Sequence, residues 1–190
     1  MLSRWLDDSF SPLVKKNITL LTGARLTTNA CYRFTPPFVA IIAKGFNISL
    51  SEIGIALTIS ELSGLLSPFI GKFVDYLSRR AAMLAGLLGI GLGALLAGAS
   101  PNIFVFTIGV TLISITKNFF DLGMSGWISD HVPYEKRGRY IGITEISWAL
   151  GLLIGVSLMG VITALSSWRA GFIAGVFGTA ISLLFIASRI

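Results

Sequence analysis

The sequence predicts an all-α integral membrane protein that crosses the bilayer six times. Apolar residues make up 54% of the chain, charged residues make up only 13%, and the mean hydropathy is +0.81. A soluble domain would carry about 25% charged residues. The charges also gather at short intervals, and the stretches between them reach the roughly 20 residues that a helix needs to cross the hydrocarbon. We therefore expect an N-terminal segment at 1–16 and a six-helix transmembrane bundle at 17–190.

The N-terminal segment contains the acidic residues Asp7 and Asp8 and has no apolar core before the first span. It therefore lacks the pattern of a cleaved signal peptide. Trp5, Leu6 and Phe10 are instead typical of a short segment at the membrane interface. We expect this segment to be cytoplasmic or interfacial.

Six apolar stretches follow, and each is long enough to form a membrane helix. The third is uncharged and rich in glycine, which favours close packing against neighbouring helices. The connections at 44–49, 100–102 and 166–167 are short and nearly uncharged, whereas the other connections carry charges. The expected helices are 17–43, 50–70, 81–99, 103–128, 140–165 and 169–188.

The distribution of lysine and arginine sets the expected orientation. Ten basic residues fall on one side of the predicted bundle and two, Lys44 and Arg169, fall on the other. Because cytoplasmic loops are enriched in Lys and Arg, both termini are expected in the cytoplasm, and the location is expected to be a bacterial-type inner (plasma) membrane. The three remaining basic residues, Arg25, Arg33 and Lys117, lie inside predicted spans.

The connection after the second span combines a glycine, an aspartate and two arginines: Gly71, Asp75, Arg79 and Arg80. Glycine permits a sharp exit from a helix, aspartate suits the positive N-terminal end of a neighbouring helix, and arginines bind carboxylates or lipid headgroups. An ordinary positive-inside loop would need only the basic residues. The spacing resembles the loop signature of the major facilitator superfamily, with Ser78 in place of a second glycine. The resemblance implies a latch that holds one transporter conformation closed.

The connection after the fourth span is similar to its counterpart in that superfamily, where an acidic residue, a proline and an arginine-glycine pair recur. Here these residues are Asp130, Pro133, Arg137 and Gly138. The resemblance implies two three-helix inverted repeats, equivalent to one half of a major facilitator fold, and secondary active transport of a small solute. It also implies a second six-helix half, from a homodimer or a separate chain, because members normally join two halves.

Glycines of the fifth span resemble a pattern found in proton-coupled drug antiporters, although Val156 and Met159 replace an expected proline and glycine. The resemblance implies proton coupling through a bent helix. Helix packing through small residues would explain Gly151 and Gly155 without any coupling role. The four glycines of the pattern are Gly142, Gly151, Gly155 and Gly160.

Five charged residues inside the predicted spans are candidates for the path of the solute and its coupled ion. A charge at the centre of a lipid-facing helix costs roughly 2.5 to 3.5 kcal/mol, so these residues are expected to face a cavity or one another. Arg25, Asn29 and Arg33 repeat every four residues and share one face of the first helix, just before Pro36 and Pro37. The five charged residues are Arg25, Arg33, Glu61, Lys117 and Asp121.

Arg25 and Asp121 lie at comparable depths, about 12 Å and 10 Å from the cytoplasmic ends of two antiparallel helices. We expect an ion pair between them, with Arg33 and Lys117 nearer the midplane. The resemblance agrees, because the first and fourth helices of each half line the solute path in that superfamily. Lys117 falls where the superfamily often has an arginine implicated in proton coupling. It would equally serve only to neutralise Asp121, one turn away.

The five embedded charges sum to about +1, which favours anionic or carboxylate-bearing solutes. Replacing Arg33 with Gln would then weaken transport of an anionic solute more than transport of a neutral one.

Other classes of function fit the residues less well. The stretch from Gly123 to Gly126 matches the GxSG string of rhomboid intramembrane proteases, but His131 follows it directly, whereas the serine needs a histidine from another helix as general base. With one cysteine, Cys31, and one histidine, neither a cofactor nor a metal is expected, and the chain has no long basic tract for nucleic acid. The alternative to a transporter half is a truncated or accessory membrane subunit without transport activity of its own.

Overall fold

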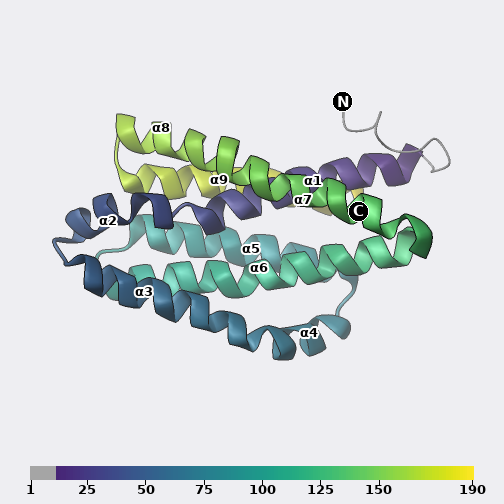
Figure 1. Cartoon of the computed structure of the whole chain (residues 1–190), viewed down its shortest axis with the longest axis horizontal. Coiled ribbons are helices and arrows are strands. Elements are labelled where there is room, and N and C mark those ends of the chain that lie inside the picture. Colours follow the sequence, from purple (N-terminus) through teal and green to yellow (C-terminus); the bar gives the residue numbers. More distant parts are fainter. Residues whose placement is uncertain (1–11) are drawn as a thin grey trace.

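The computed structural model describes residues 12–190, with side chains from Val14 onward, so the expected interfacial residues Trp5, Leu6 and Phe10 lie outside the described part. Within that part every regular element is a helix (Figure 1). The α-helices are α1 (Pro12–Arg33), α2 (Val39–Phe46), α3 (Leu50–Leu62), α4 (Ser67–Asp75), α5 (Arg79–Ala99), α6 (Ile103–His131), α7 (Tyr134–Leu150), α8 (Ser157–Leu165) and α9 (Trp168–Arg189). Three short elements join them: the 3-10 turns η2 (Pro36–Phe38) and η3 (Ser63–Leu66), and the π-helical segment η4 (Gly151–Val156).

The first expected span is broken in two. A single helix over 17–43 is therefore wrong, since α1 begins at Pro12 and ends at Arg33, and α2 starts only at Val39. Pro36 and Pro37 have no N–H to donate to the carbonyls of the preceding turn, so the regular hydrogen bonding of the α-helix cannot continue through them. The break leaves Arg33 at the last turn of α1, next to a turn rather than in the middle of a helix.

The second and fifth spans are longer than expected, because helical structure extends into residues that were expected to form connections. Gly71 lies inside α4 and not at a helix exit, and α7 already begins at Tyr134, so Arg137 and Gly138 lie in its first turns. Only Tyr76 to Ser78 separate α4 from α5. Ser78 has a φ of −64° and its side chain accepts a hydrogen bond from the N–H of Ala81, so this turn needs an N-cap and not a glycine.

Helix α5 makes the most extensive contacts of the bundle, with α6 on one side and α9 on the other. Its glycines allow this. A Cβ on Gly93 would lie 2.7 Å from the carbonyl oxygen of Gly109, and a Cβ on Gly109 would lie 2.7 Å from the backbone nitrogen of Ala97. The expected packing role of the glycine-rich third span is therefore confirmed for these contacts.

Five helical segments of the described residues are long and apolar enough to cross a membrane: Leu50–Asp75, Arg79–Ala99, Ile103–His131, Tyr134–Leu165 and Trp168–Arg189. Helix α1 does not meet that standard, because Lys15, Lys16, Asn17, Arg25 and Arg33 interrupt its apolar residues. The start of α1, the C-terminal end of α9 and the turns after α4 and α6 all lie at one end of the bundle (Figure 1).

Candidate functional site

The guanidinium of Arg25, in the middle of α1, joins three helices. Its Nε lies 3.4 Å from Oδ1 of Asp121 on α6, and its Nη1 donates to Oε1 of Glu145 on α7 at 2.6 Å. The expected ion pair between Arg25 and Asp121 is therefore confirmed. Asp121 also pairs with Lys117, one turn away on α6. We call Arg25, Lys117, Asp121 and Glu145 the charge cluster.

The cations of the charge cluster are the most shielded of its members. The side chains of Arg25 and Lys117 are each 13% exposed, whereas Asp121 is 27% and Glu145 is 52% exposed. Taking such charges out of water is unfavourable unless each has a partner. Asp121 has two cations beside it, whereas Arg25 is the one cation of the described residues that pairs with Glu145, so Glu145 is the most exposed member and the carboxylate with fewer ion pairs.

The expected net charge of about +1 is wrong, because Glu145 adds a third carboxylate to Glu61 and Asp121. The three embedded cations and three embedded anions now balance, so the argument for an anionic solute no longer holds. Glu145 lies inside the expected fifth span. A charge in a membrane helix is costly, and this cost is the feature by which the sequence could have identified Glu145 as a site residue.

A second polar group surrounds Tyr32, one turn beyond Thr28 on α1. The Tyr32 hydroxyl donates to Oε2 of Glu61 on α3 at 2.8 Å. The guanidinium carbon of Arg33 lies 4.8 Å from the ring centroid of Trp148 on α7 and 5.7 Å from that of Tyr32, and the Lys117 ammonium lies 5.6 Å from the Tyr32 ring. Such distances are typical of cation–π contacts. We call Tyr32, Arg33, Glu61 and Trp148 the Tyr32 group.

Asn29 lies between the charge cluster and Arg33 on the same face of α1. It is fully buried, and neither its amide oxygen nor its amide nitrogen has a hydrogen-bond partner among the described residues. A Cβ on Gly151 would lie 2.8 Å from the Cβ of Asn29, and one on Gly155 would lie 2.5 Å from the Cβ of Ala30. The two glycines thus allow η4 to pack directly on α1, which supports the packing interpretation of these positions.

The other two glycines of the fifth span have different surroundings. A Cβ on Gly160 would lie 2.8 Å from Cζ of Phe38, whereas nothing lies within 4 Å of a Cβ on Gly142. The span is irregular even though Val156 stands where a proline was expected, because Gly151–Val156 forms a π-helical segment. Such segments interrupt the regular hydrogen bonding of an α-helix and occur often at functional sites.

The expected latch residues meet at the end of the bundle that holds the C-terminus. Nε of Arg79 lies 3.1 Å from Oδ2 of Asp130 at the end of α6, and its Nη1 lies 3.8 Å from Oδ1 of Asp75 at the end of α4. A Cβ on Gly126 would lie 2.7 Å from Nε of Arg79. Gly126 therefore leaves the space in which Arg79 crosses α6 to reach Asp130, a role that the sequence pattern did not reveal.

The remaining latch residues cap helix ends or lie in open space. Arg80 donates to the carbonyl of Ala187 near the end of α9. Arg137 donates to the carbonyls of Val132 at 3.0 Å and Ser129 at 2.7 Å, where α6 ends. Cations suit the negative C-terminal end of a helix. Nothing lies within 4 Å of a Cβ on Gly138, and the nearest atom to one on Gly71 is 4.0 Å away, so the structure shows no steric need for glycine at either position.

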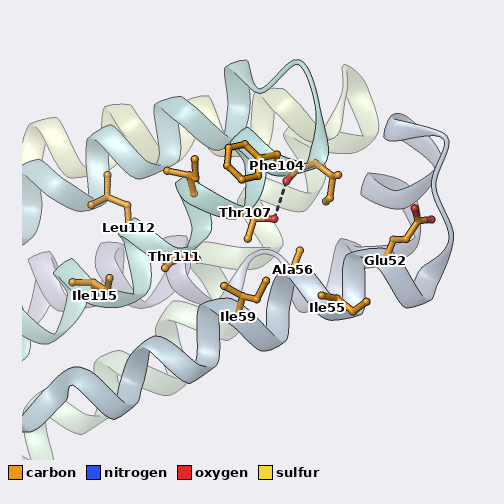
Figure 2. A pocket seen from close by; sticks show the side chains of 11 residues that line it. Glu52, Ile55, Ala56, Ile59, Phe104, Thr107, Thr111, Leu112 and Ile115 are labelled. Carbon is orange, nitrogen blue, oxygen red and sulfur yellow. Dashed lines mark hydrogen bonds between the residues drawn. The ribbon is translucent and has the colours of Figure 1, made fainter.

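A groove of about 610 Å³ lies apart from these groups, between α3 and α6 (Figure 2). Figure 2 shows Ile55 and Ile59 of α3 along one side of it, with Phe104, Thr107, Leu112 and Ile115 of α6 along the other. The carboxylate of Glu52 accepts hydrogen bonds from the backbone and hydroxyl of Ser49 as part of a helix capping box. The groove therefore offers mainly aliphatic and aromatic surface, and it is separate from the charge cluster and the Tyr32 group.

The serine of the GxSG string does not meet a base from another helix. Ser125 and His131 both belong to α6, and Nδ1 of His131 lies 2.9 Å from the carbonyl oxygen of Trp127. The His131 ring stacks on Trp127 with centroids 4.2 Å apart. Through these contacts His131 packs against the last turns of its own helix, α6.

Curated proteins with similar sequences are named as transporters or as multidrug resistance proteins. An uncharacterized transporter of the major facilitator type from Bacillus subtilis, YwfA, is 29% identical over 137 residues, which cover 72% of this chain and 33% of the relative. The vacuolar membrane amino acid uptake transporter fnx2 of Schizosaccharomyces pombe is 31% identical over 117 residues, 62% of this chain and 20% of the relative. Multidrug resistance protein 1 of Bacillus subtilis is 25% identical over 178 residues, 90% of this chain and 45% of the relative.

The fold is similar to that of a solved structure as well. A bacterial homologue of the human lysosomal transporter Spinster, in an inward-facing and unoccupied conformation, superposes with a TM-score of 0.77 at 12% identity over 95% of this chain and 43% of its own. The chain thus spans less than half the length of each of these proteins. A family model of the Major Facilitator Superfamily matches residues 21–189. The chain belongs to the major facilitator superfamily.

Proposed function

We propose that this chain forms one six-helix half of a secondary active transporter, which moves a small solute across a membrane in exchange or together with protons. The six crossings are α1 with α2, α3 with α4, α5, α6, α7 with α8, and α9, with both termini in the cytoplasm. Helix α1 counts as a crossing although it is the least apolar, because Arg25, in its middle, meets carboxylates on α6 and α7 instead of lipid. The path lies between this half and a second six-helix half.

The observation that carries the proposal is the charge cluster. Four charged side chains from α1, α6 and α7 meet within the bundle. Charges in membrane helices are costly, and those that occur commonly mark a solute path or a proton relay. An accessory subunit would need the helices but not this cluster. The same two helices that the superfamily uses for its solute path, the first and the fourth, supply three of the four charges.

Proton coupling follows from the competition for Arg25. Asp121 and Glu145 both contact its guanidinium, and Glu145 is the more exposed of the two. A proton on Glu145 removes its charge and weakens the tie between α1 and α7, while Asp121 keeps α1 tied to α6. Movement of α7 relative to α1 is then linked to proton uptake, and the π-helical segment η4 and the glycines beside Asn29 lie where that movement would take place.

The Arg79 contacts act as the latch of this cycle. Arg79 ties the start of α5 to the ends of α4 and α6 through Asp75 and Asp130, and breaking these ion pairs frees the cytoplasmic ends of the helices to separate. Because the Asp75 and Asp130 side chains are 78% and 49% exposed, each pair contributes little to stability and opens readily.

The solute is a small polar organic molecule. Relatives include a protein named for vacuolar amino acid uptake, one named as a vacuolar basic amino acid transporter and one named for multidrug resistance. The balanced charges of the embedded residues favour neither anions nor cations.

The test is solute flux into proteoliposomes with a pH-sensitive dye inside. With an imposed pH gradient, a radiolabelled mixture of the protein amino acids, or ethidium as a drug-like probe, should accumulate above the level without a gradient, and a protonophore should abolish the difference. Glu145→Gln should lose gradient-driven accumulation, whereas Glu135→Gln, at the exposed start of α7, should behave as wild type. The mass of the protein in detergent should be measured in parallel. Monomeric protein without flux of either probe would favour the accessory subunit.

A further inference from the structure

We propose that the Tyr32 group binds a zwitterionic solute, with the carboxylate of the solute on Arg33 and its ammonium on Glu61. This inference deepens the proposed function and rests on it, since it names the class of molecule that the half recognises. It starts from an asymmetry among the embedded charges. Arg25, Lys117, Asp121 and Glu145 are paired with one another, but Arg33 and Glu61 form no ion pair within the described part of the chain.

Two aromatic rings lie against the Arg33 guanidinium, and it forms no ion pair with the described residues. Its guanidinium lies over the rings of Trp148 and Tyr32, at 4.8 Å and 5.7 Å, and its Nε is buried with no hydrogen-bond partner among the described residues. Aromatic faces stabilise the charge without using the N–H groups, which lie in the plane of the guanidinium. Those N–H groups match a carboxylate, which accepts two parallel hydrogen bonds from an arginine.

The carboxylate of Glu61 has hydrogen-bond acceptor positions that are not used. Its Oε2 accepts one hydrogen bond, from the Tyr32 hydroxyl, and its side chain is exposed on α3. An ionised carboxylate has about four acceptor positions, so most of its capacity is open. An ammonium group, with three donors, is the natural partner of such a carboxylate.

The spacing between the two groups suits one small molecule. Tyr32 contacts both groups, and its distances to Arg33 and Glu61, together with the size of its ring, set an upper limit of about 12 Å on the separation of the two charges. An amino acid bound by a hydrogen bond of about 3 Å at each end bridges about 9 Å, which lies within that limit. The Tyr32 hydroxyl holds Glu61 in place for this contact.

The charge balance explains why a zwitterion is preferred to an ion. An anion would satisfy Arg33 and be repelled by Glu61, and a cation would do the reverse. A site built to hydrogen-bond a charged group rejects analogues that lack it, because its own polar group is then left desolvated and unpaired. Both ends of the solute must therefore be charged.

The experiment is a binding competition on the purified chain in detergent, without any gradient. A radiolabelled mixture of the protein amino acids is the probe, and the competitors are the same amino acids unlabelled, as methyl esters without a carboxylate, or as N-acetyl forms without an ammonium. We expect free amino acids to compete at concentrations at least about tenfold lower than either blocked form. Arg33→Gln should abolish the preference over methyl esters, and Glu61→Gln should abolish the preference over N-acetyl forms.

The split between the two variants separates recognition from folding, because a merely structural role would weaken all three competitors alike. Lys72→Gln and Glu135→Gln, both at exposed positions, are the matched controls and should keep the wild-type order. Absence of specific binding by free amino acids, or a wild-type order in both Arg33→Gln and Glu61→Gln, overturns the inference. Flux of ethidium with no amino acid binding would leave the transporter proposal standing and remove this one. Selective amino acid binding without flux would do the opposite.

Discussion

Helix α6 has two faces that are built in opposite ways. Toward α5 it presents glycine and aliphatic side chains, and Gly109 touches the backbone of α5 so closely that a Cβ would overlap Ala97. Toward α1 it presents Lys117 and Asp121: Asp121 pairs with Arg25 and with Lys117, and the Lys117 ammonium lies 5.6 Å from the Tyr32 ring. Two helices whose backbones are in direct contact have one well-packed arrangement. Charged side chains that share partners can form ion pairs in several arrangements. We therefore expect α5 and α6 to move as one body, and α7 to move relative to α1, which Asp121 ties to α6.

The largest expected effect on thermal stability is at the face of α6 that packs on α5. Gly109→Ala places a Cβ about 2.7 Å from a backbone nitrogen that has no free rotation to escape it. Overpacking of this kind costs about 1–3 kcal/mol, so we expect the midpoint of thermal unfolding in detergent to fall by about 5–10 °C. Gly54→Ala on α3, where nothing lies within 4 Å, is the control and should not lower the midpoint. Equal midpoints for the two variants would contradict the contrast between the faces.

The next effect is at the charged face. In Asp121→Asn, Lys117, which is 13% exposed, loses its ion-pair partner, and Arg25 keeps only its ion pair with Glu145. We expect gradient-driven flux to fall at least about tenfold, because the variant removes the carboxylate that pairs with both Arg25 and Lys117. Adding Lys117→Gln should restore thermal stability without restoring flux. Restoration of both would mean that the pair serves structure alone.

A smaller effect is expected at the latch. Arg79→Gln should slow flux a few-fold with little change in thermal unfolding, since exposed ion pairs contribute about 0–1 kcal/mol. Gly126→Ala should act in the same direction, because its Cβ would occupy the place of the Arg79 guanidinium, 2.7 Å away. Initial rates in proteoliposomes measure both. If Gly126→Ala keeps the wild-type rate while Arg79→Gln does not, Arg79 supports flux through Asp75 and not through Asp130.

The smallest effect is expected at Asn29. Leucine has a similar volume and removes the amide whose two polar atoms have no partner among the described residues. Asn29→Leu should therefore raise stability by about 1 kcal/mol, measured as the midpoint of thermal unfolding, while lowering the flux. Loss of stability would show that the amide is hydrogen-bonded in the folded protein, for example by water.

The sequence predicted the charged site in part, and the reason lies in how each residue signals its place. Arg25 and Asp121 were found because charges stand out in apolar helices and because depth along two antiparallel helices follows from the rise per residue. Glu145 carried the same signal but had no helical partner at one-turn spacing to draw attention to it. Gly126 gave no signal of its latch contact, since the space for Arg79 depends on a helix that is distant in sequence.

Composition and local chemistry alone determined the class of molecule, the approximate spans and the connections. Apolar stretches of membrane length must be helical, because no water is present to satisfy their backbone, and capping residues such as Ser78 and Asn102 mark where helices start. Tertiary structure decided which charges pair, which are left open and which glycines are needed. Those features depend on distances between helices, and a side chain such as Arg33 acquires its surroundings, Trp148 and Tyr32, only when α1 and α7 pack together.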